Sequence, residues 1–174
     1  MSIQKWRPCT CATKKHTNIR VKWDGTHVTF GGRTDAAQTP TFLLAKLQEL
    51  FPAEKLAAHL FGPVCLYGEG YGAKIQKGGG NYKADGVDFV LFDVLIGDWW
   101  LNWEDVVGVG EALNVAVVPT VGIGPLYDAT KSIERGLVSQ WGNFPAECLV
   151  VRPMVDLRTR RGRRIIGKLK AADF

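Results

Sequence analysis

Residues 89–96, Phe-Val-Leu-Phe-Asp-Val-Leu-Ile, form a nearly continuous apolar run that turn-forming residues bound on both sides. Such a run predicts a central strand of a sheet with little exposure to solvent. No apolar run reaches the about 20 residues that a membrane span needs, so we expect a soluble protein with no membrane attachment. With 174 residues, of which 46% are hydrophobic, the chain is long enough to bury a core of its own.

The segments around this strand predict short strands and helices in mixed order. Ile19, Val21 and Trp23 alternate with polar residues, and Asp24-Gly25 follows with the two positive-φ positions of a tight turn, so residues 18–30 are expected to form a hairpin. Further periodicity predicts helices over 39–50, with Thr39 as N-cap, and over 52–60, 103–113 and 127–135, and strands over 64–67, 115–118, 148–152 and 164–170. This order predicts an α+β fold with mostly antiparallel sheets and inserted helices.

Three further segments carry residues suited to binding. Glu69 lies between two glycines in a glycine-rich loop directly after a predicted strand, where its carboxylate can accept hydrogen bonds from a sugar or hold a metal. Glu147 precedes the strand predicted over 148–152. Lys168 and Lys170 share one face of a predicted strand, an arrangement that suits a polyphosphate. The alternatives are turn chemistry for Glu69 and a solvated strand face for the two lysines.

Charge and cysteine content limit the partners and the compartment. The net charge is +5, and seven cations fall within the last 17 residues: Arg158, Arg160, Arg161, Arg163, Arg164, Lys168 and Lys170. This cluster indicates a phosphate-rich partner, unless it is only a solvated basic face. The four cysteines lack the spacing of a disulfide framework, which indicates a reducing cytoplasm.

Five motifs, taken in order, resemble the nucleotidyltransferase domain shared by ATP-dependent RNA ligases, DNA ligases and capping guanylyltransferases. The phage-type RNA ligases that seal nicks are the most similar branch. The motifs are Phe-Gly-Gly-Arg-Thr-Asp at 30–35, Leu-Tyr-Gly-Glu-Gly-Tyr-Gly at 66–72, Asp-Phe-Val-Leu-Phe-Asp-Val at 88–94, Ala-Glu-Cys-Leu-Val-Val-Arg-Pro at 146–153 and Ile-Ile-Gly-Lys-Leu-Lys at 165–170. The resemblance implies the covalent nucleotidyltransferase (ATP-grasp-like ligase) fold over residues 13–174, preceded by an atypical segment over residues 1–12.

The resemblance also implies an activity. In this family a lysine attacks the α-phosphate of ATP, AMP remains on the lysine and then passes to an RNA 5′-phosphate, and a 3′-hydroxyl completes the join. Expected cofactors are ATP and Mg²⁺, and the expected partner is nicked or broken RNA. We expect a monomer that acts in RNA repair in a bacterial or phage-infected cytoplasm.

Family roles transfer to this chain residue by residue. By resemblance Glu69 binds the ribose, Phe92 stacks on adenine, and Arg33 contacts the nucleotide or RNA phosphates. The remaining implied residues are Asn18 in the nucleotide site, Glu147 as the Mg²⁺ ligand, and Lys168 and Lys170 as the cations that meet the phosphates during attack.

The nucleophile is less directly assigned, because the family pattern Glu-Lys-x-Asp/His-Gly-Thr-Asn is incomplete here. Thr17-Asn18 matches the end of the pattern, and Lys14 takes the lysine position if one glycine has been deleted. Without that gap, Thr13 would occupy the position and no nucleophile would remain. Lys22-Trp23-Asp24-Gly25 satisfies a shorter pattern but lies one strand too late, so Lys14 is the predicted nucleophile, ahead of Lys15 and Lys22.

Three departures leave two functional alternatives. Thr13 stands where the family has glutamate, Cys148 follows Glu147 where the family prefers glycine, and residues 1–11 replace the strands that normally precede the lysine motif. We therefore expect an N-terminally truncated domain. It is either an RNA ligase or a catalytically inactive relative that binds nucleotide or nucleic acid. DNA ligases and capping enzymes usually carry a further domain after the paired lysines, whereas this sequence ends four residues beyond Lys170.

Overall fold

The computed structural model describes residues 4–9, 17–34, 36–76 and 78–174, with side chains from residue 17 onward. The chain divides into two compact units. One unit contains residues 14–117, and the other contains residues 118–174 together with the N-terminal residues up to 13. Each unit has its own sheet and its own core.

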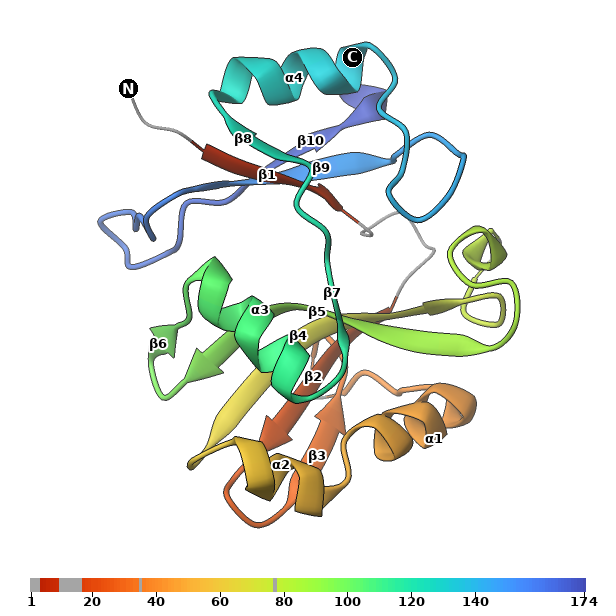
Figure 1. The fold of residues 1–174 in the computed structure, drawn as a ribbon, viewed down its shortest axis with the longest axis vertical. Helices are drawn as coiled ribbons and strands as arrows, with labels where there is room; N and C mark the ends of the chain where they lie inside the picture. Colours follow the sequence, from red (N-terminus) through yellow and green to blue (C-terminus); the bar gives the residue numbers. More distant parts are fainter. Residues whose placement is uncertain (1–3, 10–16, 35, 77) are drawn as a thin grey trace. The chain divides into compact units, whose positions relative to one another are not determined.

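The unit of residues 14–117 is built on a six-stranded sheet in the order β3-β2-β4-β5-β6, with β7 beside β5 (Figure 1). Its strands are β2 (Thr17–Trp23), β3 (Val28–Gly31), β4 (Val64–Gly72), β5 (Val87–Ile96), β6 (Trp99–Trp100) and β7 (Ala116–Val117). All neighbours are antiparallel except β5 and β7. The apolar run 89–96 lies in β5, between β4 and β6, so the predicted central strand is confirmed.

Three helices cover one face of this sheet: α1 (Thr41–Leu50), α2 (Ala53–His59) and α3 (Trp103–Ala112). Leu43 and Leu47 of α1 are fully buried against the sheet, and the rings of Phe51 and Phe89 meet edge to face with centroids 5.1 Å apart. The Asn102 side chain caps α3 by accepting a hydrogen bond from the Asp105 N–H. None of the helices in the described residues is long and apolar enough to span a bilayer.

The unit that contains residues 118–174 is a four-stranded sheet in the order β10-β9-β1-β8, covered on one face by α4 (Leu126–Glu134) (Figure 1). Its strands are β1 (Gln4–Cys9), β8 (Gly122–Gly124), β9 (Cys148–Pro153) and β10 (Gly167–Lys170). The core joins Ala129 and Ile133 of α4 to Leu149 and Val151 of β9. The mixed α+β architecture with mostly antiparallel strands is therefore confirmed in both units.

Several local predictions are wrong in detail. Thr39 does not cap α1, because the helix begins at Thr41 with Pro40 as its cap and no side-chain hydrogen bond there. The turn after β2 has one positive-φ residue, Gly25, and not two. Asp24 instead holds the turn through its carboxylate Oδ1, which accepts hydrogen bonds from the N–H groups of Thr26 and His27, both at 2.7 Å.

The largest differences in strand limits occur in β4 and β10. The strand predicted over 64–67 continues through Gly72. The strand predicted over 164–170 begins only at Gly167, because residues 156–165 form a separate narrow hairpin whose Arg158 and Arg164 pair across it. No element was predicted for residues 4–9, which form β1, an inner strand of its sheet.

Candidate functional site

The face of the six-stranded sheet opposite the three helices carries most of its polar side chains. Side chains alternate along a strand, so the residues between the core positions Ile19, Val21 and Leu66 lie on this other face. We call it the polar face, and its members are Asn18, Arg20 and Lys22 of β2, Tyr67, Glu69 and Tyr71 of β4, and Asp88 and Asp93 of β5.

Asn18 and Glu69 are direct partners in the pairing of β2 with β4, so the structure brings two predicted site residues together. Glu69 lies inside β4, and the prediction that it occupies a loop after the strand is wrong. Its side chain is only 4% exposed, whereas Asn18 is exposed. A buried carboxylate in a strand is held in one position by its neighbours, which favours hydrogen bonding over merely shaping a turn.

The glycines beside Glu69 are explained by packing rather than by approach of a ligand. A Cβ on Gly68 would lie 2.1 Å from the Phe89 ring, and a Cβ on Gly70 would lie 2.5 Å from Leu43. Both glycines therefore let the ring and the helix residue pack against the strand on the core side.

A bulge in β5 places Phe92 and Asp93. Tyr67 pairs with Asp93 while Gly68 pairs with Leu91, so Phe92 is an extra residue without a partner in the register. By plain alternation Asp93 would share the core face with Leu91, but the extra residue moves it to the face of Tyr67. Asp93 is 2% exposed there, and Phe92 is half-buried.

The tyrosines of β4 stay protonated over a wide pH range. Burial, followed by a hydrogen bond with the Cys65 thiol, raises the pKa of Tyr67 to about 12. Burial, followed by the negative charge of Asp88, raises the pKa of Tyr71 to about 12. Both phenols therefore keep their O–H groups near neutral pH and remain able to donate hydrogen bonds on the polar face.

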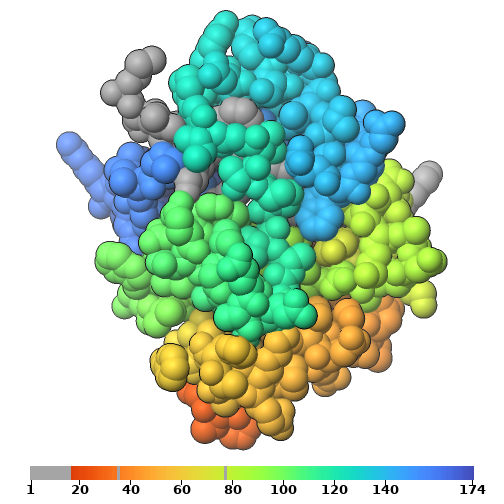
Figure 2. Space-filling model, viewed as in Figure 1, coloured from red at the N-terminus to blue at the C-terminus, as the bar shows by residue number. Residues whose placement is uncertain are grey.

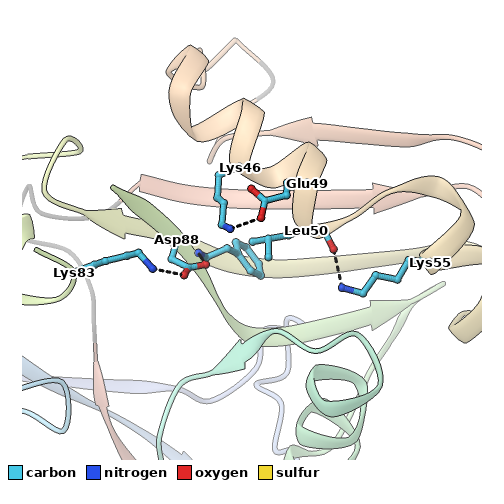
Figure 3. Close-up of polar contacts among 7 residues, drawn as sticks. Lys46, Glu49, Leu50, Lys55, Lys83 and Asp88 are labelled. Atoms are coloured by element: carbon cyan, nitrogen blue, oxygen red, sulfur yellow. Dashed lines mark hydrogen bonds and ion pairs between the residues drawn. The ribbon is translucent and has the colours of Figure 1, made fainter. Parts of the chain in front are cut away.

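An ion pair lies at the end of the β4–β5 hairpin. Lys83 Nζ lies 2.9 Å from Asp88 Oδ2, as Figure 3 shows. The other Asp88 oxygen accepts a hydrogen bond from the Phe89 N–H at 2.9 Å. Both side chains are partly exposed, so the pair contributes about 1 kcal/mol or less to stability. Its effect is to tie the glycine-rich segment after β4 to the start of β5.

Arg33 is exposed in the loop that follows β3. Arg20 of β2 attaches this loop to the sheet, because its Nε donates a hydrogen bond of 2.7 Å to the Gly32 carbonyl. On its other side the loop is tight, because the Ala37 N–H donates to the Thr34 carbonyl and a Cβ on Gly32 would lie 2.7 Å from that of Ala37. Arg20 thus fixes the backbone next to Arg33.

Glu147, Lys168 and Lys170 belong to the other unit. Lys168 pairs with Val150 and Lys170 with Cys148, whereas Leu149 lies in the core beneath α4. Both lysines therefore share one face of the strand, as predicted, and this face points away from α4. The Glu147 carbonyl accepts a hydrogen bond of 3.0 Å from the N–H of Ala171, the residue after Lys170. These three predicted residues are thus neighbours at one end of the β9–β10 pair.

The predicted site residues are divided between the two units. Asn18, Arg33, Glu69 and Phe92 occur in one unit, and the Glu147 group occurs in the other. Lys14, the predicted nucleophile, lies outside the described residues, as does its competitor Lys15. Their roles stay predictions.

Lys22, the third candidate, is exposed on the polar face opposite Cys65. It lies four residues along β2 from Asn18, about 13 Å at the rise of an extended strand. Asp24 and Gly25, which complete the short pattern that begins at Lys22, form the turn of the hairpin. Turn formation therefore explains this pattern.

Sequence reasoning gave no individual role to five polar-face residues that surround the predicted ones: Arg20, Tyr67, Tyr71, Asp88 and Asp93. Arg20 and Tyr71 share the parity of Asn18 and Glu69 in their strands, and that spacing was a usable signal. Asp93 had a weaker signal, an acid within an apolar run, and its face could not be read without the bulge.

The comparisons with known proteins agree with this geometry. Residues 15–170 match the family model described as RNA ligase. The chain belongs to the RNA ligase family. This membership favours the RNA ligase branch over the DNA ligases and capping enzymes considered from the sequence. Among curated proteins, no match was found.

The solved structures show the same fold. Naegleria gruberi RNA ligase with PPi matches with a TM-score of 0.74 and 18% sequence identity. A lysine-to-alanine variant of that ligase with ATP and Mn matches with the same score and 18% identity, and a second such variant with ATP and Mn matches at 20% identity. Each match covers 99% of this chain and 50% of the other chain. The chain thus spans about half the length of the structures that it matches.

The residues present fit the groups that the family implies. Among the described residues, no cluster of three or more histidines, cysteines or acids forms a metal cage. Mg²⁺ at nucleotide sites is commonly held by one or two carboxylates together with substrate phosphates, and Glu147 beside two lysines fits that mode. Glu69 supplies a carboxylate of the kind that binds sugar hydroxyls, and half-buried Phe92 supplies an aromatic ring.

Proposed function

We propose that this protein is an ATP-dependent RNA ligase that transfers AMP from ATP to one of its own lysines and then to an RNA 5′-phosphate, which is sealed to a 3′-hydroxyl. The observation that carries the proposal is the direct pairing of Asn18 with buried Glu69 on a polar face, in a chain of the RNA ligase family. Solved structures of the same fold contain ATP and Mn, and this supports the use of a nucleotide and a divalent metal by the present chain.

The polar face is proposed to bind the nucleoside. The carboxylate of Glu69 accepts hydrogen bonds from the ribose hydroxyls, and because it is 4% exposed, little water competes for it. Phe92 stacks on adenine, and its bulged position sets its ring apart from the regular alternation of β5. Arg33, positioned through Arg20 and Gly32, contacts a phosphate of the nucleotide or of RNA.

The cations of β10 are proposed to bind the triphosphate. Lys168 and Lys170 lie two residues apart on one strand face, and their two ammonium groups meet the negative charge that develops on the oxygens of the α-phosphate. Glu147 would hold Mg²⁺, which when bound neutralises phosphate charge and orients the leaving group. No metal cage is needed from the protein, because the phosphates supply the other oxygens.

Lys14 is proposed as the nucleophile. Its amine must lose a proton before it can attack, and nearby cations lower the pKa of a lysine. A bond then forms from the lysine nitrogen to the α-phosphorus as the bond to pyrophosphate breaks. Attack requires accurate placement, since a displacement of about 1 Å can cost about 100-fold in rate. The missing glycine near Lys14 bears on this step most directly.

The alternative function is that of an inactive relative that binds nucleotide or nucleic acid without covalent chemistry. Thr13 in place of glutamate and the shortened nucleophile motif favour it. The polar face would be retained in such a protein, because its residues are fixed by strand pairing rather than by the nucleophile loop.

The two functions are separated by incubation with ATP labelled at the α-phosphate and Mg²⁺, followed by denaturing electrophoresis. The ligase predicts a covalent label that is stable to alkali and labile to acid. Lys14→Ala should abolish it, whereas Lys22→Ala and the exposed control Lys74→Ala should retain it.

Two results would count against this assignment. Label that persists in Lys14→Ala but disappears in Lys22→Ala would move the nucleophile to β2. A complete lack of label, in the wild-type chain and in a variant with glycine inserted between His16 and Thr17, would favour the binding protein.

A further inference from the structure

Residues 156–165 form a short hairpin that projects from the β9–β10 pair; we call it the arginine hairpin. Its backbone is defined by hydrogen bonds from the Ile165 N–H to the Leu157 carbonyl at 2.7 Å and from the Thr159 N–H to the Arg163 carbonyl at 2.8 Å. Gly162, with φ of +75°, closes the turn. In Figure 1 this segment extends beyond the end of its own sheet, and in Figure 2 the same blue segment stands out at the margin of the view.

The tip of this hairpin is strongly cationic. Five of the seven residues 158–164 are arginines, and none of the seven is acidic or hydrophobic. Arg158 lies 3.3 Å from the Asp156 carboxylate, whereas the exposed side chains of Arg160, Arg161 and Arg163 have no acidic partner in the described part of the chain. The fold therefore holds several guanidinium groups in solvent at a defined place.

We propose that the arginine hairpin binds the phosphate backbone of RNA outside the nucleotide site. Guanidinium groups form paired hydrogen bonds with phosphate oxygens, and a phosphate chain offers several such partners in succession. The proposal rests on the RNA ligase function proposed above for the choice of RNA. The arginine hairpin is then a second element that holds the substrate, and it contains none of the residues assigned to ATP.

A membrane surface is the other anionic partner to consider. Binding to lipid normally places apolar side chains at the deepest point of a basic element. Here the exposed aliphatic residues Leu157 and Ile165 lie at the base of the hairpin, and the tip between them contains only arginine, threonine and glycine. The order of charge and apolar surface thus favours a polyanion that stays in water.

Contacts of this kind depend on charge and not on base sequence. RNA phosphates release condensed counterions when cations replace them, so binding weakens steeply with salt. Each lost phosphate contact lowers the slope of log affinity against log salt by about 0.7 to 0.9. The hairpin should therefore contribute equally to RNAs of different sequence.

The test measures binding of a nicked RNA duplex by fluorescence anisotropy over a range of salt concentrations. Arg160→Gln/Arg161→Gln removes two exposed charges at the tip, where neither side chain supports the hairpin backbone. The matched control Lys74→Gln/Arg135→Gln removes two exposed charges elsewhere. The hairpin variant should bind RNA about tenfold more weakly with a slope lower by about 1.4 to 1.8, while the control stays close to wild type.

Several outcomes would overturn the proposal. These are equal affinity and slope in the hairpin variant and wild type, an equal loss in the control, or no binding of RNA by the wild-type chain. A loss confined to anionic phosphatidylserine vesicles, with RNA binding unchanged, would assign the hairpin to membranes instead.

Labelling with ATP in the absence of RNA separates this proposal from the proposed enzyme function. The hairpin variant should be labelled as fully as wild type, because its arginines are not assigned to ATP. If wild type is never labelled but the RNA result holds, the ligase proposal fails and the hairpin proposal stands. If labelling is normal but RNA affinity is unchanged in the hairpin variant, the hairpin proposal fails and the ligase proposal stands.

Discussion

The two units present their polar residues in opposite ways. In residues 14–117, the carboxylates of Glu69 and Asp93 are 4% and 2% exposed and lie on strands whose other face packs against three helices. In the unit of residues 118–174, Lys168 is half-buried, Lys170 is exposed, and the arginine hairpin extends into solvent. One unit buries acids within a packed sheet, and the other displays cations at the end of a strand pair.

This difference indicates what each unit is suited to bind. A buried carboxylate keeps a fixed position, and the packing around it keeps water away. Both properties suit recognition of the hydroxyl groups of a nucleoside. Exposed cations act over a distance and tolerate different arrangements of phosphate. We therefore propose that packing determines nucleoside recognition in the first unit and that charge determines phosphate binding in the second.

The largest expected effect comes from the packing under Glu69. Gly68→Ala places a Cβ 2.1 Å from the Phe89 ring and 2.4 Å from the Val90 carbonyl oxygen. We expect a loss of about 3 kcal/mol in the free energy of unfolding, measured by urea denaturation. Hydrogen exchange should rise in residues 64–72 and 87–96 but not in 148–153.

Gly108→Ala is the matched control for this substitution. Gly108 is an exposed helical residue, and a Cβ there would meet no atom within 4 Å. Alanine should stabilise α3 by about 0.5 to 1 kcal/mol, because glycine loses more backbone entropy on folding. Equal and small changes in the free energy of unfolding for the two substitutions would contradict the claim that close packing fixes the position of Glu69 in the first unit.

The next effect is a dependence of stability on alkaline pH in the first unit. Because the pKa of Tyr71 is raised to about 12, the folded state holds its proton above the pKa of about 10 of the unfolded chain. Its contribution is complete below pH 10 and is lost as the pH rises toward 12. We expect Tyr71 to account for a loss of about 1 kcal/mol between pH 9 and pH 11. Urea denaturation of Tyr71→Phe should show a correspondingly smaller loss.

The smallest effect concerns the turn beside Lys22. Hydrogen bonds from the N–H of His27, then from Thr26, lower the pKa of Asp24 to about 2. The turn should therefore keep these bonds above the unfolded pKa of about 4 and lose them as the pH falls through about 2. The Asp24 carboxyl carbon signal in NMR should titrate with this midpoint. If Asp24→Ala abolished labelling with ATP in a folded protein, Asp24 would have a chemical role that its hairpin geometry does not explain.

Sequence reasoning recovered the strands and helices whose periodicity is regular. It placed β5 from its apolar run, and α3 and α4 to within one residue at each end. It missed β1, because a single inner strand such as residues 4–9 depends on partners that are distant in sequence. Strand pairing of that kind leaves little local pattern.

Apart from the shared face of Lys168 and Lys170, the site was predicted as residue types but not as geometry. Glu69 and the paired lysines were found from motifs, yet Glu69 was placed in a loop because its glycine neighbours are typical of turns. Those glycines serve Phe89 and Leu43, which are apart from them in sequence. The face of Asp93 depends on one extra residue in β5, and such a bulge changes parity without a distinct sequence signal.

The most direct test of the division between the units compares adenosine with ATP by titration calorimetry. Glu69→Gln should lower the affinities for adenosine and for ATP by a similar factor of about tenfold, because both ligands use a hydrogen bond to the charged Glu69 carboxylate. Lys168→Met/Lys170→Met should lower the affinity for ATP by at least about tenfold and leave the affinity for adenosine unchanged. Adenosine affinity that is unaffected by Glu69→Gln, or that falls with the lysine pair as much as ATP affinity does, would contradict the account.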